Sequence, residues 1–430
     1  MMDIGDETMN TIFISGYNVS GIKSLEKNVH LSFCKKTLDA QLDLKDYHMK
    51  GIYGPVGSGK TALLTSIAIL KNILLHPSYL QHPIIQSKLD ASIHKKNKEL
   101  AICVDFFIKK DANRTLYRYA LTLGKQENSQ YEIIKESVYV KTARSSSIPL
   151  KKVFEYCLDQ PFYLDPSYAT PMVSMFINDV DKRLKNSSLI ALSMEKTNKK
   201  YAKDEFFKIL SGVFSFALQT HVYVESLNYS FLCKEEKMQK EQHMLNKIRV
   251  NQNYVKKEDY LAFEASVNQI GAYLKLFKPD LKRIVIRKKE NHGVFVCDLW
   301  MEYDGYLIAA DQESRGIRKL FALYPYFQAM KDGAIVFIDD FDIWIHEVYG
   351  LALLTYLLEE GKGQLCFTSN NVAYMDVLKQ SKKSIDFLNE KQELRSWITN
   401  GNYSPSKLYR ARAIEGVDLC IQKDDFKGVF

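Results

Sequence analysis

The sequence lacks the features that mark membrane and secreted proteins. It contains no run of 18 or more apolar residues, the length that a helix needs to span a membrane. Its first residues are acidic and have no apolar signal core, so no secretory leader is expected. Internal repeats and low-complexity tracts do not stand out. We therefore expect a cytoplasmic protein without a membrane partner.

Cysteine is present but never in a paired arrangement. The seven cysteines are scattered singly, and none belongs to a C-x-x-C motif. An odd number of isolated cysteines argues against a disulfide framework and against a cysteine-rich zinc site. The cysteine pattern therefore indicates a reducing compartment.

A strong excess of charge of either sign is also missing. The 430 residues include 59 Lys and Arg against 51 Asp and Glu, which gives a net charge of +8. This modest excess permits contact with nucleic acid without requiring it. Local basic clusters occur at residues 95–98, 182–185 and 282–289. Taken alone, each cluster is interpreted as solvated surface.

One glycine-rich segment carries a strong chemical signal. It fits the pattern G-x-x-x-x-G-K-[ST] without a gap, through Gly54, Pro55, Val56, Gly57, Ser58, Gly59, Lys60 and Thr61. An apolar stretch precedes it and a helical pattern follows to about Leu75, which is the strand–loop–helix setting that this motif requires. Backbone N–H groups of such a loop crowd around a phosphate, and the helix N-terminus adds partial positive charge.

The phosphate loop predicts binding of a nucleoside triphosphate, which we take as ATP. Lys60 is expected to reach the β- and γ-phosphates, and Thr61 is expected to hold Mg²⁺. The alternative is a glycine-rich turn that merely precedes a core helix.

The pattern of apolar residues predicts two kinds of region. Residues 100–108, 115–123 and 131–140 alternate as strands of an antiparallel meander, and residues 11–15 and 29–33 also predict strands. From about 150 to 275 the pattern is mainly helical, including residues 234–250. Strands return at 284–286, 294–296 and 307–309.

The second chemical signal follows a continuous apolar run at residues 334–338, which suits a strand buried on both faces of a parallel sheet. Asp339 and Asp340 end this run. We expect Asp339 to bind Mg²⁺ and Asp340 to polarise the attacking water, although a surface pair after a core strand is the alternative. Residues 364–368 predict another central strand, whose polar end at 369–371 is placed to sense the γ-phosphate. Residues 384–388 predict an edge strand.

More than half of the chain separates Lys60 from Asp339, so the intervening material is expected to be a large insertion. We predict a nucleotide-binding α/β lobe from residues 10–150 and 330–430. A mainly helical lobe is predicted from residues 150–330.

An ordered set of segments resembles a known family. The set comprises residues 21–25, the phosphate loop, the antiparallel region, residues 313–320 at the start of a helix, residues 337–342 and residues 367–371. In this order they resemble the ABC-type ATPase heads of RecF, the SMC proteins and the OLD nucleases. The chain is most similar to stand-alone ATPases of that group from bacterial phage-defence operons. The resemblance implies an α/β P-loop NTPase fold with a mixed sheet, an antiparallel β meander and an inserted helical lobe that carries the signature motif.

The resemblance also implies a head-to-tail dimer with ATP sandwiched between subunits. Ser314 and Gly316 of one subunit would then bind the γ-phosphate held by the other, as a helix N-terminus can. Without the family, residues 313–316 are a helix-capping stretch. His346 lies where the group commonly has a histidine, and is either a dimer contact or structural.

Two residues depart from the family pattern. Asp340 stands where the family often has Glu, and Asn370 stands where it often has His. Asn can hydrogen-bond to a phosphate but cannot take up a proton near neutral pH. Both departures predict slow hydrolysis, with ATP acting as a conformational clamp.

Three functions are consistent with these features. The first is a dimeric ATPase switch in antiphage defence that controls a separate effector protein, such as a nuclease, because the chain has no convincing effector module of its own. The second is a RecF-like DNA-repair clamp, whose basic clusters would form a salt-sensitive path for DNA. The third is a nucleotide-dependent scaffold with vestigial hydrolysis.

Overall fold

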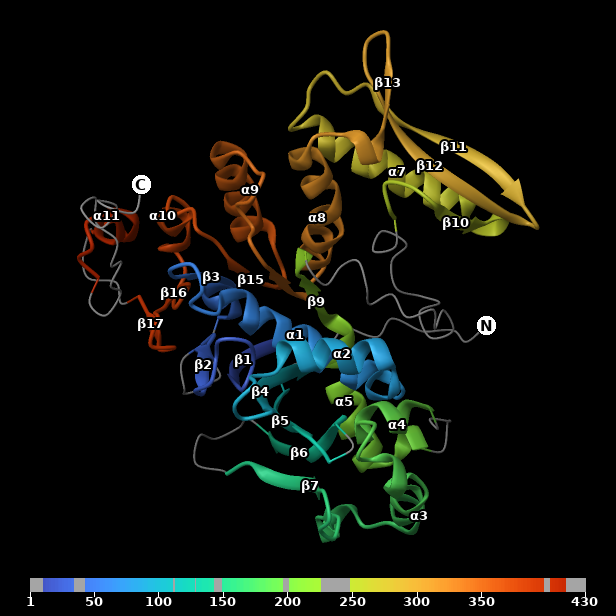
Figure 1. Cartoon of the computed structure of the whole chain (residues 1–430), viewed down its shortest axis with the longest axis vertical. Coiled ribbons are helices and arrows are strands. Elements are labelled where there is room, and N and C mark those ends of the chain that lie inside the picture. Colours follow the sequence, from blue (N-terminus) through green and yellow to red (C-terminus); the bar gives the residue numbers. More distant parts are fainter. Residues whose placement is uncertain are drawn as a thin grey trace.

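The computed structural model describes residues 11–34, 43–110, 113–127, 129–142, 149–195, 201–225, 248–397 and 403–414. These residues form a mixed α/β fold with three β-sheets. In Figure 1 the strands that carry the phosphate loop lie near the middle of the molecule, with an antiparallel sheet below them and helices α8 and α9 above. A small sheet lies beyond α8, at the far end from the antiparallel sheet.

The largest sheet has seven strands, and all its pairings are antiparallel. In spatial order they are β2 (Val29–Ser32), β1 (Thr11–Ser20), β4 (Glu99–Lys110), β5 (Asn113–Lys125), β6 (Tyr131–Thr142), β7 (Lys151–Cys157) and β8 (Tyr163–Leu164). The predicted meander is confirmed, because β4, β5 and β6 are neighbours in chain order. It extends on both sides beyond the three strands that the sequence pattern predicts.

The second sheet has six strands and carries the phosphate loop. Its order is β17 (Leu394–Ser396), β16 (Ile385–Leu388), β3 (Met49–Tyr53), β15 (Gln364–Thr368), β14 (Ile335–Ile338) and β9 (Thr220–Tyr223). From β16 to β9 every pairing is parallel. All residues of β3, β14 and β15 are buried, as the apolar runs predict for strands covered on both faces. The edge position predicted for residues 384–388 is wrong, because β17 pairs with β16 on the side away from β3.

Two apolar clusters cover the two faces of the six-stranded sheet. Ile335 and Phe337 point into the cluster shared with the seven-stranded sheet and α1, whereas Val336 and Ile338 point into the cluster shared with α8 and α9. The helices are α1 (Lys60–Leu75), α2 (Pro83–Ser92), α3 (Pro171–Val180), α4 (Leu189–Glu195), α5 (Glu205–Gln219), α7 (Tyr260–Lys275), α8 (Arg315–Lys331), α9 (Glu347–Glu360), α10 (Tyr374–Leu378) and α11 (Pro405–Arg410). Within the described ranges, no helix is both long and apolar enough to cross a bilayer.

The stretch between residues 150 and 330 contributes to several parts of the molecule. Helices α4 and α5 pack with α1 and the seven-stranded sheet, and β9 joins the six-stranded sheet. Strands β10 (Asn253–Lys256), β12 (Val294–Glu302), β11 (Arg283–Asn291) and β13 (Leu307–Ala309) form the small sheet, which packs on α7. The helix predicted at 234–250 lies mostly outside the described residues, and the predicted lobe boundaries stay predictions.

Candidate nucleotide-binding site

The phosphate loop connects β3 to α1, and three of its residues have backbone conformations that only glycine adopts easily. Gly54, Gly57 and Gly59 have φ angles of 157°, 84° and 108°. Gly59 is the N-cap of α1, and a Cβ atom there would clash with the side chain of Leu25. The turn at residues 21–25 therefore packs directly against the loop. Val56, at the tip of the loop, is 95% exposed, so the loop faces solvent.

Lys60 is the first residue of α1, and its side chain is buried beneath the loop. The Lys60 ammonium donates to the carbonyl oxygens of Gly54 and Pro55, at 2.6 and 3.1 Å. Burial lowers the pKa of Lys60, and the negative charges of Asp340 and its neighbour Asp339 oppose this shift. The ammonium is thus held inside the loop, in the electric field of the aspartates that end β14. Thr61 follows as the second residue of the helix and is half-buried.

The two aspartates are positioned by the strand that lies between β14 and β3. The Thr368 hydroxyl, at the end of β15, donates to Asp339 Oδ1 at 2.7 Å and accepts from the backbone N–H of Asp340 at 2.8 Å. Asp340 has a φ of 47°, a left-handed conformation that is uncommon outside glycine. One hydroxyl group therefore fixes the Asp339 carboxylate and the backbone of Asp340 at the edge of the sheet where β3 runs into the phosphate loop.

The half-buried Asp340 carboxylate has an altered acidity. Its burial, together with the charges of Asp339 and Asp342, raises the pKa of Asp340, while Lys319 and Lys60 lower it. A raised pKa makes a carboxylate a better proton acceptor, which suits a group that polarises water.

The residues present fit a cation that is bound by oxygen atoms of the protein and of a phosphate group. In the part of the chain that the structure describes, no three His, Cys, Asp or Glu residues form a metal site by themselves. Mg²⁺ takes one or two protein oxygens together with phosphate oxygens and water, and Asp339 and Thr61 supply such oxygens. The Ser58 hydroxyl, buried in the loop, has no hydrogen-bond partner among the described residues, which leaves a polar atom for a ligand.

Ser314 and Gly316 lie at the start of α8. The exposed Ser314 hydroxyl accepts from the backbone N–H of Ile317 at 3.4 Å, so its capping role is confirmed. A Cβ atom on Gly316 would lie 2.8 Å from the carbonyl oxygen of Trp344, so glycine lets α8 approach the turn after β14 closely. The Arg315 guanidinium covers the Trp344 ring at 4.8 Å. Binding of a phosphate in trans stays a prediction for Ser314 and Gly316.

Asn370 and His346 have local roles in the structure. Asn370 is exposed just after β15, and its backbone N–H donates to Asp342 Oδ1 at 3.2 Å. It therefore lies at the same sheet edge as the aspartates, and its role as a γ-phosphate sensor stays a prediction. The His346 ring accepts from the backbone N–H of Val348 at 3.4 Å and caps α9, which supports the structural interpretation of this histidine.

Three residues near the site are not among the site residues that the sequence predicts. They are Thr368, Lys23, whose ammonium donates to Thr65 of α1 at 3.2 Å, and Lys319, which is buried in α8. Each of the three falls within a segment that carries the family resemblance, at residues 367–371, 21–25 and 313–320. Their sequence positions do not reveal that the amines of Lys23 and Lys319 both lie in the electric field of Asp339.

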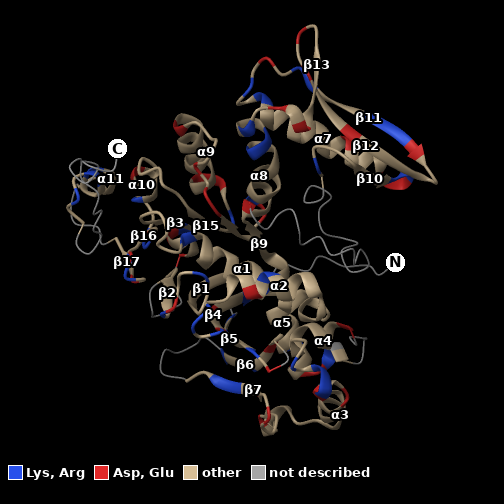
Figure 2. Cartoon of the chain, in the orientation of Figure 1, with Lys and Arg blue, Asp and Glu red and all other residues tan. Residues whose placement is uncertain are grey.

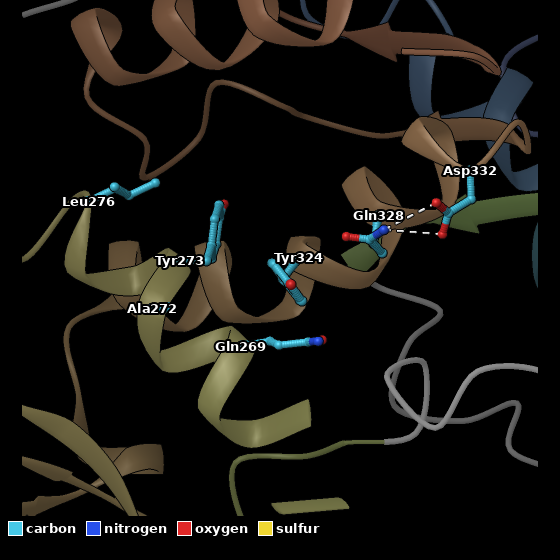
Figure 3. Close-up of a pocket in the computed structure, with 7 residues that line it drawn as sticks. All are labelled: Gln269, Ala272, Tyr273, Leu276, Tyr324, Gln328 and Asp332. Carbon is cyan, nitrogen blue, oxygen red and sulfur yellow. Dashed lines mark hydrogen bonds between the residues drawn. The ribbon is translucent and has the colours of Figure 1, made fainter. Parts of the chain in front are cut away.

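A separate hollow of about 580 Å³ lies between α7 and α8. Figure 3 shows its lining residues, which are Gln269, Ala272, Tyr273, Leu276, Tyr324, Gln328 and Asp332. Gln328 donates to both carboxylate oxygens of Asp332 there. None of the predicted site residues lines this hollow. The phosphate loop lies elsewhere and is exposed at its tip, at Val56 and Gly57.

Comparisons with known proteins identify no family for the chain. No family model matches it, and no curated protein matches it. Among solved structures, it is similar to the Smc head domain with a coiled coil and joint derived from Pyrococcus yayanosii. The two are 13% identical over 93% of this chain and 100% of that chain, with a TM-score of 0.42. A TM-score of this size does not establish a shared fold.

Proposed function

We propose that this protein binds Mg-ATP at the phosphate loop and hydrolyses it. One observation carries the proposal: Thr368 fixes Asp339 and Asp340 at the sheet edge where the phosphate loop begins, and Lys60 lies in the field of both carboxylates. A phosphate-binding loop opposite an acidic strand end is the arrangement that P-loop NTPases use for phosphoryl transfer.

Each residue has a distinct part in the proposed reaction. The backbone N–H groups of the loop and the Lys60 ammonium bind the β- and γ-phosphates, whose negative charge they offset. Thr61 and Asp339 would hold Mg²⁺, which neutralises charge on the phosphates when bound. Asp340 orients the attacking water and accepts its proton. Asn370 donates a hydrogen bond to the γ-phosphate, and because Asn cannot move a proton, we propose that hydrolysis is slow.

We further propose that the active form is a head-to-tail dimer. The exposure of Ser314 at the N-terminus of α8 supports this step, because its hydroxyl and the helix end are accessible to the nucleotide of a second subunit. A role in bacterial antiphage defence, with a separate effector protein controlled by the dimer, rests on the sequence resemblance alone.

The dimer proposal has a direct test. Asp340→Ala should bind ATP and accumulate as a dimer, since binding is retained while hydrolysis is slowed to a small residual rate. Adding Ser314→Arg should return that protein to monomers without weakening ATP binding by one subunit. Ser174→Arg, on an exposed position of α3, is the matched control and should stay dimeric. Light scattering in the presence of ATP measures the molar mass of both double variants. Dimers in the variant that carries Ser314→Arg would contradict the trans contact.

A second candidate function, nucleic-acid binding, is favoured by the small sheet. The Arg287 guanidinium of β11 stacks 3.7 Å from the ring of Trp300 on β12, and Tyr254 of β10 is 72% exposed. Figure 2 shows a blue stretch of Lys and Arg in the second half of β11. Basic side chains beside accessible aromatic rings suit phosphates and stacked bases.

Binding of single-stranded DNA at several salt concentrations tests this candidate. Arg287→Ala should weaken binding and make the slope of log affinity against log salt shallower by about one unit or less. Lys208→Ala, on an exposed position of α5, is the control. An unchanged slope for Arg287→Ala would exclude the small sheet as the contact.

A further inference from the structure

Lys319 is a buried cation with little to balance it. Its side chain is 2% exposed, and its ammonium has no hydrogen-bond partner within the described ranges. The nearest carboxylate oxygen is Oε2 of Glu225, at 4.0 Å, and the side chain of Glu225 is 60% exposed. The ammonium also lies 4.5 Å from the centre of the Tyr223 ring.

The position of Lys319 relates it to the candidate site. Tyr223 ends β9 and pairs with Ile338, the last residue of β14. The Tyr223 carbonyl accepts from the backbone N–H of Asp339 at 2.8 Å. Lys319 therefore lies over the end of β9, next to the point where the aspartates begin. The charged groups that act on it are Glu225, Asp340, Asp339 and Asp342.

Packing alone does not account for a lysine at this place. A buried ammonium loses its hydration and needs hydrogen bonds or an anion in return. Burial indeed lowers the pKa of Lys319, despite the four carboxylates around it. A methionine of similar length would fill the same space without that cost. The amine is thus an unfavourable element of the folded state, and packing does not explain its presence.

Three of the four carboxylates either accept a hydrogen bond or are mostly exposed to solvent. Asp339 accepts from Thr368, Asp342 accepts from the backbone N–H of Asn370, and Glu225 is mostly exposed. The Asp340 side chain has no hydrogen bond to any residue that the structure describes, and Lys319 is one of the two cations that favour its charged form. Asp340 is thus a half-buried carboxylate without a hydrogen bond among the described residues, in the electric field of this buried amine.

We propose that Lys319 is a positioning residue whose ammonium orients the Asp340 carboxylate for its action on the attacking water. The inference rests on the proposed ATPase function and deepens it. Lys319 belongs to the same helix whose N-terminus carries Ser314, so α8 links the exposed end of the signature segment to the hydrolytic group of its own subunit.

The test compares turnover, nucleotide affinity and stability in one set of variants. Lys319→Met should lower kcat by about 10- to 100-fold, because a misplaced catalytic group costs rate. The directly measured Kd for Mg-ATP should change less than about threefold, and the thermal midpoint should stay level or rise. Lys319→Arg should recover part of kcat. Lys331→Met, at an exposed position of α8, should match the wild type in all three measurements.

A double-variant cycle separates positioning from other roles. Once Asp340→Ala has removed the carboxylate, adding Lys319→Met should lower the residual turnover no further. The inference would be overturned if Lys319→Met lowers turnover equally with and without the Asp340 carboxylate. It would also be overturned if ATP affinity falls as much as kcat, or if the thermal midpoint falls and Lys319→Arg recovers no kcat. If Lys319→Met does not fold, the cycle is run with Lys319→Arg. Absence of wild-type ATP turnover would instead overturn the proposed function.

Discussion

The two large sheets each contain a buried carboxylate, and their surroundings differ. Glu136 of β6, in the seven-stranded sheet, accepts three hydrogen bonds: from the Tyr119 hydroxyl at 2.8 Å, the Ser188 hydroxyl at 2.6 Å and the backbone N–H of Leu189 at 2.9 Å. Asp339, at the end of β14 in the six-stranded sheet, accepts from one described side chain, that of Thr368.

The difference separates a structural carboxylate from one that can take a ligand. The hydrogen bonds of Glu136 come from three groups inside the protein, on β5 and at the start of α4, so its oxygens are committed to the fold. Asp339 has lone pairs left over, and it lies where parallel strands end beside the phosphate loop. The same chemical group thus stabilises one sheet and is available for chemistry at the edge of the other.

The largest expected effect is on catalysis. Asp339→Asn keeps the shape of the side chain and removes the charge that would hold Mg²⁺. We expect kcat for ATP hydrolysis to fall on the order of 10²- to 10³-fold, with the free energy of unfolding changed by less than about 1 kcal/mol. Steady-state kinetics and urea unfolding measure the two quantities. Unchanged turnover would remove Asp339 from the site.

Glu136→Ala should show the opposite pattern. Its removal leaves three buried donors without an acceptor, and we expect a loss of about 3 kcal/mol in the free energy of unfolding. The Kd for Mg-ATP should stay at the wild-type value, since the seven-stranded sheet does not contact the phosphates in the proposed site. Urea unfolding monitored by circular dichroism gives the first value, and titration calorimetry the second. A stable Glu136→Ala protein that no longer binds ATP would reverse the assignment of the two carboxylates.

Lys71 sharpens the comparison because its pKa is shifted by burial alone, with no contribution from a carboxylate. Burial lowers the pKa of Lys71 in α1 from 10.5 to about 8. The unfolded chain therefore binds more protons between these values, and the stability of the wild type should rise from pH 8 to pH 10.5 by roughly 1–3 kcal/mol relative to Lys71→Met. Denaturant unfolding at pH 7, 9 and 10.5 measures this difference. Parallel pH profiles for the two proteins would show that Lys71 keeps its ordinary pKa.

Thr368→Val should give the smallest effect. The variant keeps the volume of the side chain but leaves Asp339 and the backbone N–H of Asp340 without the hydroxyl. We expect kcat to fall about tenfold, which corresponds to about 1.4 kcal/mol. Thr355→Val, which removes a hydroxyl that bonds within α9, is the control. Equal effects in the two variants would show that Thr368 has no special role at the site.

Local sequence patterns were sufficient for the elements that carry the site. The strand–loop–helix at residues 49–75 follows from glycine spacing and helical periodicity, and β14 and β15 follow from their apolar runs. The position of β16 was not predictable, because its outer neighbour β17 has the short sequence Leu-Arg-Ser, without a strand pattern. The partners of Glu136 and Lys319 come from distant segments, and such contacts leave no periodic signal in the sequence.

The central claim is that the phosphate loop binds a nucleoside triphosphate. Titration calorimetry of the wild type, Lys60→Ala and the control Lys27→Ala, an exposed lysine, tests it with Mg-ATP at one salt concentration. We predict one site per subunit in the wild type and in Lys27→Ala. For Lys60→Ala we predict a Kd raised by at least about tenfold, because the ammonium that meets the phosphates is gone. No binding by the wild type, or equal binding by Lys60→Ala, would contradict the claim.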